Sequence, residues 1–359
     1  MRRFHIDPDI TRAKTLSTEF YTSPQYFEEA KEKIFAKSWQ FAGDTDMVSE
    51  HGSVYPFTLF PGYIDEPLLL SKDKQGKMHC LSNACTHRGN LVAYEAGKVN
   101  LLRCRYHGRQ FLLDGSFLSM PEFKEVKDFP APCDDLTSLP LFNWGKLLFT
   151  TLHTGSNATD FFGQMMERVN FLPLDKLVYR PDLSKDYHVK ANWALYCENY
   201  LEGFHIPFVH AGLNAVLDFG EYTTELFRYS NLQLGIGKKG DVCFDLPETS
   251  ADFGKEVAAY YFWVFPNMMF NFYPWGLSLN IVHPMGISSC KISFLSFVYD
   301  ETRLGTGAGS GLDTVELEDE EVVENVQKGI RSSFYEHGRY SATREQGTHH
   351  FHSIIAQFM

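Results

Sequence analysis

The sequence is organised around two short stretches, CTHRG at residues 85–89 and CRYHG at residues 104–108. Each stretch supplies one thiol and one imidazole, and sixteen residues separate the first ligand pair from the second. A [2Fe–2S] cluster in which two histidines replace two cysteines on one iron needs this ligand set, presented by two tight loops. The glycine that ends each stretch stands where such a loop turns back with positive φ. The predicted cluster ligands are Cys85, His87, Cys104 and His107.

Zinc is the alternative occupant for this set, because two Cys and two His also form structural zinc sites. A zinc finger pairs like ligands, with two Cys in one short loop and two His in the other. Here each loop mixes one Cys with one His. The mixed order favours iron, and the two loops resemble the cluster-binding loops of Rieske proteins.

The length of 359 residues favours two domains over one. Between residues 39 and 153 the sequence consists of short alternating segments broken by Gly, Pro and Asp, such as SVYPFTL at 53–59. This pattern is typical of a small antiparallel β domain, and it includes both ligand loops. Residues 154–359 mix longer helical segments with apolar strands. We therefore expect a cluster domain at 39–153 and a second domain formed by residues 1–38 and 154–359.

Composition and charge argue against several classes of partner. The formal net charge is -12, which disfavours a nucleic acid and an anionic membrane surface. No apolar run reaches the roughly 18 residues that a membrane span needs. Arg2 and Arg3 have no apolar segment behind them, so the N-terminus resembles neither a secretory nor a twin-arginine signal. We expect a cytoplasmic protein.

A second group of candidate ligands lies in ENYLEGFHIPFVH at residues 198–210. If the chain is helical up to Pro207, Glu202 and His205 lie three residues apart on one face, with His210 just beyond. Two such histidines could ligate a metal or could be satisfied in a core. A chain that holds a one-electron carrier needs an electron acceptor, and two His with one carboxylate bind the Fe(II) that activates O₂. The joint occurrence favours a mononuclear iron site.

Together the two groups resemble the Rieske non-haem iron oxygenases, and the resemblance covers nearly the whole chain. It implies an α+β fold, with a small antiparallel β Rieske domain and a larger catalytic domain whose antiparallel sheet is covered by helices in a helix-grip-like arrangement. It also implies one [2Fe–2S] cluster and one mononuclear Fe(II) per chain. The family motif Asn-x-x-(Asp or Glu)-x-x-His-x₄-His falls on Asn199, Glu202, His205 and His210.

The third iron ligand implied by the resemblance is a carboxylate in the acidic stretch at 316–324. Such a run is usually a solvated helix face. The family helix resembles Asp-x₄-Glu-x-Val-Gln-x-Gly, which places Asp319 at the ligand position. Spacing alone leaves Glu318 and Glu320 open.

The resemblance assigns Glu202 a further role, together with Asn199 in the catalytic motif. In the family this carboxylate, commonly an Asp, joins an iron ligand to a cluster histidine of the neighbouring subunit, here His205 to His107. That arrangement implies a head-to-tail ring, and we expect a homotrimer. No flavin or nicotinamide fingerprint is evident, so electrons from NAD(P)H would arrive through a separate reductase or ferredoxin.

The substrate is the least determined feature. Residues 260–276 alternate like buried strands and are rich in aromatic residues, which is typical of a core. The same residues could form a pocket wall, where Tyr and Trp faces bind a quaternary ammonium. Stretches at 327–332, 338–340 and 349–352 resemble the choline monooxygenase and glycine-betaine or carnitine oxygenase branch, with His349, His350 and His352 in packing or channel roles. An aromatic-ring-hydroxylating dioxygenase α subunit and a pure electron-transfer Rieske protein are the alternatives.

Overall fold

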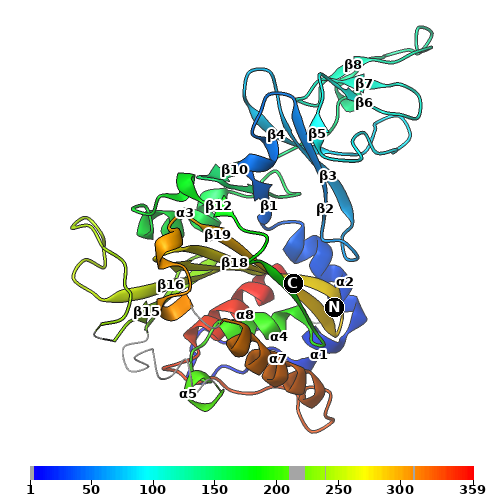
Figure 1. The fold of residues 1–359 in the computed structure, drawn as a ribbon. Helices are drawn as coiled ribbons and strands as arrows, with labels where there is room; N and C mark the ends of the chain where they lie inside the picture. The colour runs from blue at the N-terminus through cyan, green and yellow to red at the C-terminus, as the bar shows by residue number, and fades with distance from the viewer. Residues whose placement is uncertain (1–3, 210–222, 239, 310–311) are drawn as a thin grey trace. The chain divides into compact units, whose positions relative to one another are not determined.

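The computed structural model describes residues 4–209, 223–238, 240–309 and 312–359. The chain divides into two compact units, one formed by residues 36–156 and the other by residues 1–35 and 157–359. Antiparallel sheets dominate both units, and most helices belong to the larger one (Figure 1). The predicted α+β class is confirmed.

The smaller unit consists of short antiparallel strands in three sheets, with the orders β1-β11-β10, β5-β2-β3-β4-β9 and β6-β7-β8. Its core contains Leu69, Leu81 and Phe111, all with no exposed surface, and the thiols of Cys85 and Cys104 belong to the same cluster. The ligand loops are therefore anchored in a packed interior. The strands are β1 Gln40–Asp44, β2 Ser53–Leu59, β3 Glu66–Lys72, β4 Met78–Ser82, β5 Gly97–Lys98, β6 Leu102–Arg103, β7 Gln110–Phe111, β8 Phe117–Ser119, β9 Ser138–Leu139, β10 Leu141–Trp144 and β11 Leu147–Thr150.

The larger unit is built on one antiparallel sheet with the order β12-β19-β18-β17-β16-β15-β14, in which β13 also pairs with β19. Its strands are β12 Val178–Tyr179, β13 Lys185–Val189, β14 Thr223–Leu226, β15 Ser230–Ile236, β16 Val257–Val264, β17 Met268–Tyr273, β18 Gly276–Gly286 and β19 Ser289–Val298. Its helices are α1 Thr18–Thr22, α2 Pro24–Ala30, α3 Ala158–Arg168, α4 Trp193–Tyr200, α5 Ile206–Val209, α7 Leu312–Gly329 and α8 Gln346–Phe358.

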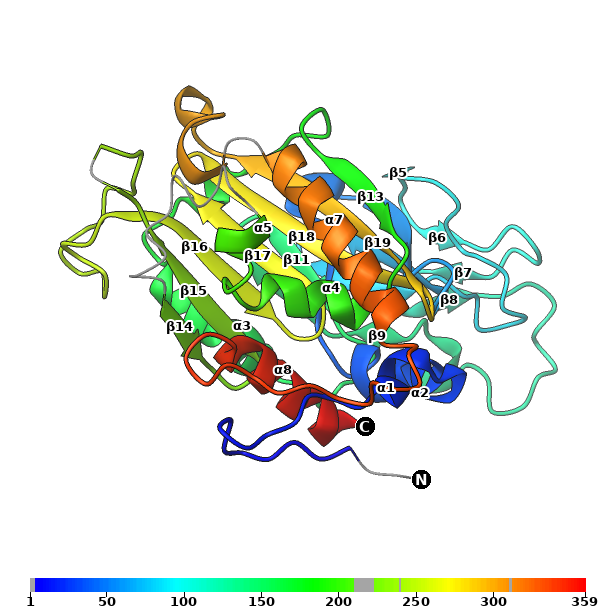
Figure 2. The ribbon, with the colours of Figure 1, turned by 90° about the horizontal axis from the view of Figure 1, so that it is seen from below.

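Helices pack on both faces of this sheet. The ring of Phe270 lies 6.4 Å from that of Phe162 in α3, whereas the ring of Trp263 lies 5.1 Å from that of Phe351 in α8. Trp263 pairs with Met269, the neighbour of Phe270, so the two aromatic side chains point to opposite faces of the sheet. Figure 2 shows α4, α7 and α8 lying across one face. The helix-covered sheet expected from the resemblance is thus present.

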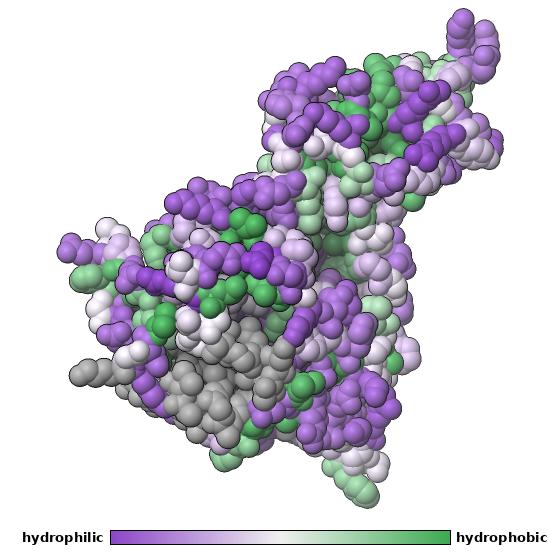
Figure 3. Space-filling model, in the orientation of Figure 1, coloured by the Kyte–Doolittle hydropathy of each residue, from purple (hydrophilic) through white to green (hydrophobic). Residues whose placement is uncertain are grey.

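Close packing joins α8 to the end of α4. A Cβ atom added at Gly347 would stand 2.2 Å from the carbonyl oxygen of Leu201, so only glycine allows this approach. Within the described part of the chain, no helix is long and apolar enough to cross a membrane. The face drawn in Figure 3 is mostly hydrophilic, with hydrophobic residues in small groups.

Candidate metal centres

Both predicted cluster loops close in the same way. The amide of Gly89 donates to the carbonyl of Cys85 at 2.9 Å, and the amide of Gly108 donates to the carbonyl of Cys104 at 3.1 Å. The two glycines have φ of 70° and 76°, a region that residues with a Cβ rarely adopt. The local sequence therefore folds each loop back around its thiol.

The four predicted ligand side chains meet in this unit. His87 Nδ1 lies 3.1 Å from His107 Nδ1, and the thiols of Cys85 and Cys104 are buried next to each other. Two imidazole nitrogens that bind one tetrahedral metal at about 2.1 Å would stand about 3.4 Å apart. Two histidines on one side and two thiols on the other fit a Rieske-type cluster, in which each iron takes two protein ligands.

The pKa shifts of His87 and Cys104 favour the form that binds a metal, whereas that of Cys85 favours the neutral thiol. Burial lowers the pKa of His87, and the positive charges of His107, Arg88 and Arg109 add to this effect. The neutral ring is the form that binds a metal. Burial raises the pKa of Cys85. Burial also acts to raise the pKa of Cys104, but hydrogen bonds from the Tyr106 amide and the Asn90 side chain outweigh it and lower that pKa.

The second predicted group does not lie in one helix, so the condition of a helix up to Pro207 is not met. α4 ends at Tyr200, and α5 begins at Ile206. Between them the Glu202 carboxylate accepts the amides of Phe204 and His205, which replaces helical hydrogen bonding by a local turn. Pro207 lies in the first turn of α5, where no amide proton is needed.

The turn and α7 bring three of the predicted residues together. His205 Nδ1 lies 2.7 Å from Glu202 Oε1, and His205 Nε2 lies 3.5 Å from Asp319 Oδ1. When the Nδ1 proton is donated to Glu202, Nε2 is the ring nitrogen whose lone pair can bind a metal. Asn199 is half-buried in the last turn of α4. His210 lies outside the described residues.

Within the described ranges, no three His, Cys, Asp or Glu side chains converge as ligands of a single metal ion. Three neighbouring acids of α7, Glu318, Asp319 and Glu320, are the candidates for the third iron ligand. Glu318 and Glu320 are half-buried on α7 like Asp319, and Asp319 Oδ1 lies 3.5 Å from His205 Nε2.

A buried acid joins α4 to α7, and no sequence pattern indicates it. Glu316 is only 4% exposed, and its Oε2 accepts the Tyr196 hydroxyl at 2.5 Å. Burial raises the pKa of Glu316 to about 8, so this carboxyl is largely protonated at neutral pH. Only tertiary packing distinguishes it from the half-buried and exposed acids of the same run.

A second buried network of hydrogen bonds involves Glu198 of α4 and is centred on His352. His352 has no exposed surface, and its two ring nitrogens lie 2.6 Å from the Tyr340 hydroxyl and 3.1 Å from Glu198 Oε1. The Tyr21 hydroxyl donates to the same Glu198 oxygen at 2.7 Å. Of the packing and channel roles predicted for His352, its burial agrees with packing, and it connects α1 and α8 to α4.

The aromatic stretch at 260–276 forms the centre of the sheet, and Tyr260, Phe262 and Phe272 are fully buried. Polar groups occur on the face toward α4. Gln233 Nε2 donates to the Tyr200 carbonyl at 2.7 Å, and the Tyr200 hydroxyl donates to Asn271 Oδ1 at 2.8 Å. The core interpretation of this stretch agrees with its burial, and its polar face lies beneath the helix that precedes the motif.

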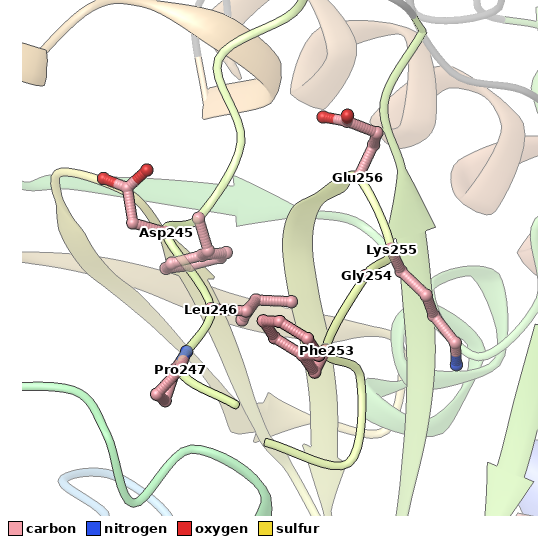
Figure 4. Close-up of a pocket in the computed structure, with 8 residues that line it drawn as sticks. Asp245, Leu246, Pro247, Phe253, Gly254, Lys255 and Glu256 are labelled. Atoms are coloured by element: carbon pink, nitrogen blue, oxygen red, sulfur yellow. The ribbon is translucent and has the colours of Figure 1, made fainter. Parts of the chain in front are cut away.

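A hollow of about 460 Å³ opens on the larger unit (Figure 4). Leu246 and Phe253 lie next to each other in it, and charged residues lie around them. The lining residues are Phe244, Asp245, Leu246, Pro247, Phe253, Gly254, Lys255 and Glu256. None of them belongs to the candidate metal centres.

Comparison with known proteins gives the class of protein that this fold and these centres define. Residues 38–130 match the Rieske [2Fe-2S] domain, and residues 177–359 match the catalytic domain of the ring hydroxylating alpha subunit. The chain belongs to the Rieske non-haem iron oxygenase family. It is therefore an oxidoreductase that carries a [2Fe–2S] cluster and mononuclear iron, as the family does, and the predicted family is confirmed.

Particular relatives include chloroplastic choline monooxygenases. That of Beta vulgaris is 30% identical, covering 96% of this chain and 78% of the relative, and that of Arabidopsis thaliana is 30% identical, covering 97% and 84%. The carnitine monooxygenase oxygenase subunit of Escherichia coli (strain K12) is 26% identical over 96% of this chain and 94% of its own.

Solved structures agree with the fold. A quaternary ammonium Rieske monooxygenase superposes with a TM-score of 0.77 and 23% identity, covering 98% of this chain and 96% of that chain. Naphthalene 1,2-dioxygenase from Rhodococcus sp. superposes with a TM-score of 0.74 and 19% identity, covering 96% and 94%. At these identities the likeness concerns the fold alone.

Proposed function

We propose that this oxygenase hydroxylates a small quaternary amine such as choline, a betaine or carnitine. The observation that carries the proposal is the 30% identity to choline monooxygenase over nearly the whole chain. The relatedness to the carnitine monooxygenase subunit points to the same class of substrate. An aromatic ring, the alternative substrate, is favoured by the ring hydroxylating description of the catalytic-domain match and by a likeness of fold.

We propose that Cys85, His87, Cys104 and His107 hold the cluster and that His205, His210 and Asp319 hold the mononuclear iron. The convergence of the two ring nitrogens of His87 and His107 supports the first set. The position of His205 between two carboxylates supports the second. When bound, the cluster supplies single electrons and the mononuclear iron supplies an open site for O₂.

Glu202 would prepare the proposed mononuclear iron site in two ways. Glu202 accepts a hydrogen bond from His205 Nδ1, which fixes the orientation of the ring and increases its basicity. The same carboxylate accepts the His205 amide at 3.1 Å, so it also fixes the backbone on which the ring is carried. Asn199, in the last turn of α4, completes the motif.

The overall reaction balances with an external reductant. One oxygen atom of O₂ enters a C–H bond, at the carbinol carbon of choline or next to nitrogen in an N-methyl group, and the other leaves as water with two protons and two electrons. We propose that the electrons come from NAD(P)H through a separate reductase or ferredoxin. Choline would give an aldehyde hydrate, whereas an oxidised N-methyl group would be released as formaldehyde.

The domain boundaries support this division of labour. We propose a Rieske domain at 39–153 and a catalytic domain formed by 1–38 and 154–359. The compact units change at residues 36 and 156, and the two family matches begin at 38 and 177. A cytoplasmic location stays a prediction, because the plant relatives are named chloroplastic.

The first experiment is substrate-triggered oxidation. The purified protein is reduced anaerobically, mixed with choline, glycine betaine, carnitine or naphthalene, and exposed to O₂ while the Rieske absorbance and the product mass are followed. We expect rapid cluster oxidation and a hydroxylated or demethylated product with a quaternary amine only. A response only to naphthalene, with two oxygen atoms added, would assign the chain to the ring dioxygenases instead.

We also propose a homotrimer in which Glu202 joins His205 to His107 of the partner subunit. A heterologous contact that closes into a ring is the symmetry class this requires. Light scattering should give three times the mass of one chain for the active protein. A strictly monomeric protein that still turned over would exclude the route between subunits.

A further inference from the structure

The smaller unit buries an arginine directly after the second ligand loop. Arg109 is only 2% exposed, although arginine is almost never fully buried without a partner. Its guanidinium lies 4.9 Å from the ring centre of Phe117, 5.5 Å from that of Phe129 and 5.7 Å from that of Phe111. Three aromatic rings therefore surround this positive charge and shield it from water.

Arg109 is connected to both ligand loops. Its carbonyl accepts the amide of Cys104 at 2.9 Å, which belongs to the second loop. Its Nη2 donates to the carbonyl oxygen of Asp134 at 3.0 Å, and Thr86 Oγ1 donates to that same oxygen at 2.7 Å. Thr86 stands between the two ligands of the first loop. The carbonyl oxygen of Asp134 therefore links the Arg109 guanidinium to the loop that carries Cys85 and His87.

The counter-ion of Arg109 is better hydrated than Arg109 itself. Arg109 Nη2 lies 2.6 Å from Asp134 Oδ1, but the Asp134 side chain is 17% exposed and that of Arg109 is 2% exposed. Burial acts to raise the pKa of Asp134, but the Ala131 amide and Arg109 outweigh it and keep the carboxyl ionised. Water screens the charge of Asp134 more than that of Arg109, so a net positive electrostatic potential remains around the buried guanidinium. Arg109 Nε is buried and makes no hydrogen bond within the described residues.

We propose that the buried guanidinium of Arg109 raises the reduction potential of the [2Fe–2S] cluster through its positive charge. The inference rests on the proposed cluster ligands. Reduction adds one negative charge to the cluster, and net charge and burial are among the factors that set cluster potentials. In a chain with a net charge of -12, this local positive charge favours the reduced form and thus the loading of each electron.

The test measures the midpoint potential of the purified, cluster-loaded oxygenase in spectroelectrochemical titrations. Arg109→Gln should shift the reduction equilibrium about tenfold toward the oxidised form, which for one electron equals about 59 mV. Arg109→Lys keeps the charge and should stay near the wild-type potential. Asp134→Asn removes the counter-ion and should shift the potential in the opposite direction, upward.

Arg105→Gln is the matched control. It removes the same charge from the second ligand loop, but Arg105 is exposed and lies over the face of Tyr94, 4.7 Å from the ring centre. Water screens this charge, so the potential should move much less than in Arg109→Gln.

Two results would overturn the proposal. The first is a wild-type potential in Arg109→Gln with an unchanged cluster spectrum. The second is a downward shift or no shift in Asp134→Asn, a result that also decides the matter if Arg109→Gln fails to fold. A wild-type protein without a Rieske spectrum would instead contradict the proposed cluster ligands, so the two failures are distinguishable.

Discussion

Replacing His205 by alanine should abolish oxygenation and leave the visible Rieske spectrum unchanged. His205 is the residue whose ring nitrogens face both Glu202 and Asp319, at 2.7 and 3.5 Å. Alanine removes a proposed ligand of the mononuclear iron from the larger unit, whereas the four proposed cluster ligands belong to the smaller unit. Iron analysis should show loss of the mononuclear iron with retention of the two cluster irons, and no product should form.

His188→Ala is the matched control, because it removes an exposed imidazole from β13 in the same unit. Its activity and iron content should be those of the wild type. Loss of the Rieske spectrum in His205→Ala would show that the ligand assignments of the two centres are crossed.

Iron analysis and product formation also distinguish the three candidate acids of α7, Glu318, Asp319 and Glu320. Asp319→Ala should behave like His205→Ala, whereas Glu318→Gln and Glu320→Gln should keep the mononuclear iron. Retained iron and turnover in Asp319→Ala would move the third ligand to one of its neighbours.

Replacing Glu202 by glutamine should slow electron delivery about 10- to 100-fold without emptying the cluster site. The carboxylate accepts three hydrogen bonds, from His205 Nδ1 and from the amides of Phe204 and His205. An amide keeps the size but loses the charge, and its NH₂ group cannot accept a hydrogen bond. The rate is measured by stopped-flow oxidation of the reduced cluster in the presence of substrate and O₂.

Glu202→Asp is the control for charge, since Asp occupies this position in the commonest form of the family motif. It should retain more of the rate than Glu202→Gln. Cluster oxidation at the wild-type rate in Glu202→Gln would remove the bridging role from this residue.

Some features followed from local sequence because their cause is local. A thiol and an imidazole two or three residues apart, followed by a glycine with positive φ, determine a loop almost independently of the rest of the chain. Alternation in residues 53–59 determined β2 for the same reason, and β2 spans those residues. The chain is not helical between Glu202 and His205, because a side-chain carboxylate competes for backbone amides there.

The sequence by itself determined the family, the cluster loops and the identity of the candidate ligands, because ligand chemistry depends on residue type and short spacing. Only the tertiary structure brought Asp319 to His205 across more than a hundred residues. It also separated the buried Glu316 from the half-buried and exposed acids of the same run and buried Arg109 among three rings. Burial and charge pairing arise when distant segments pack, and a linear pattern does not encode which side of a helix faces that contact.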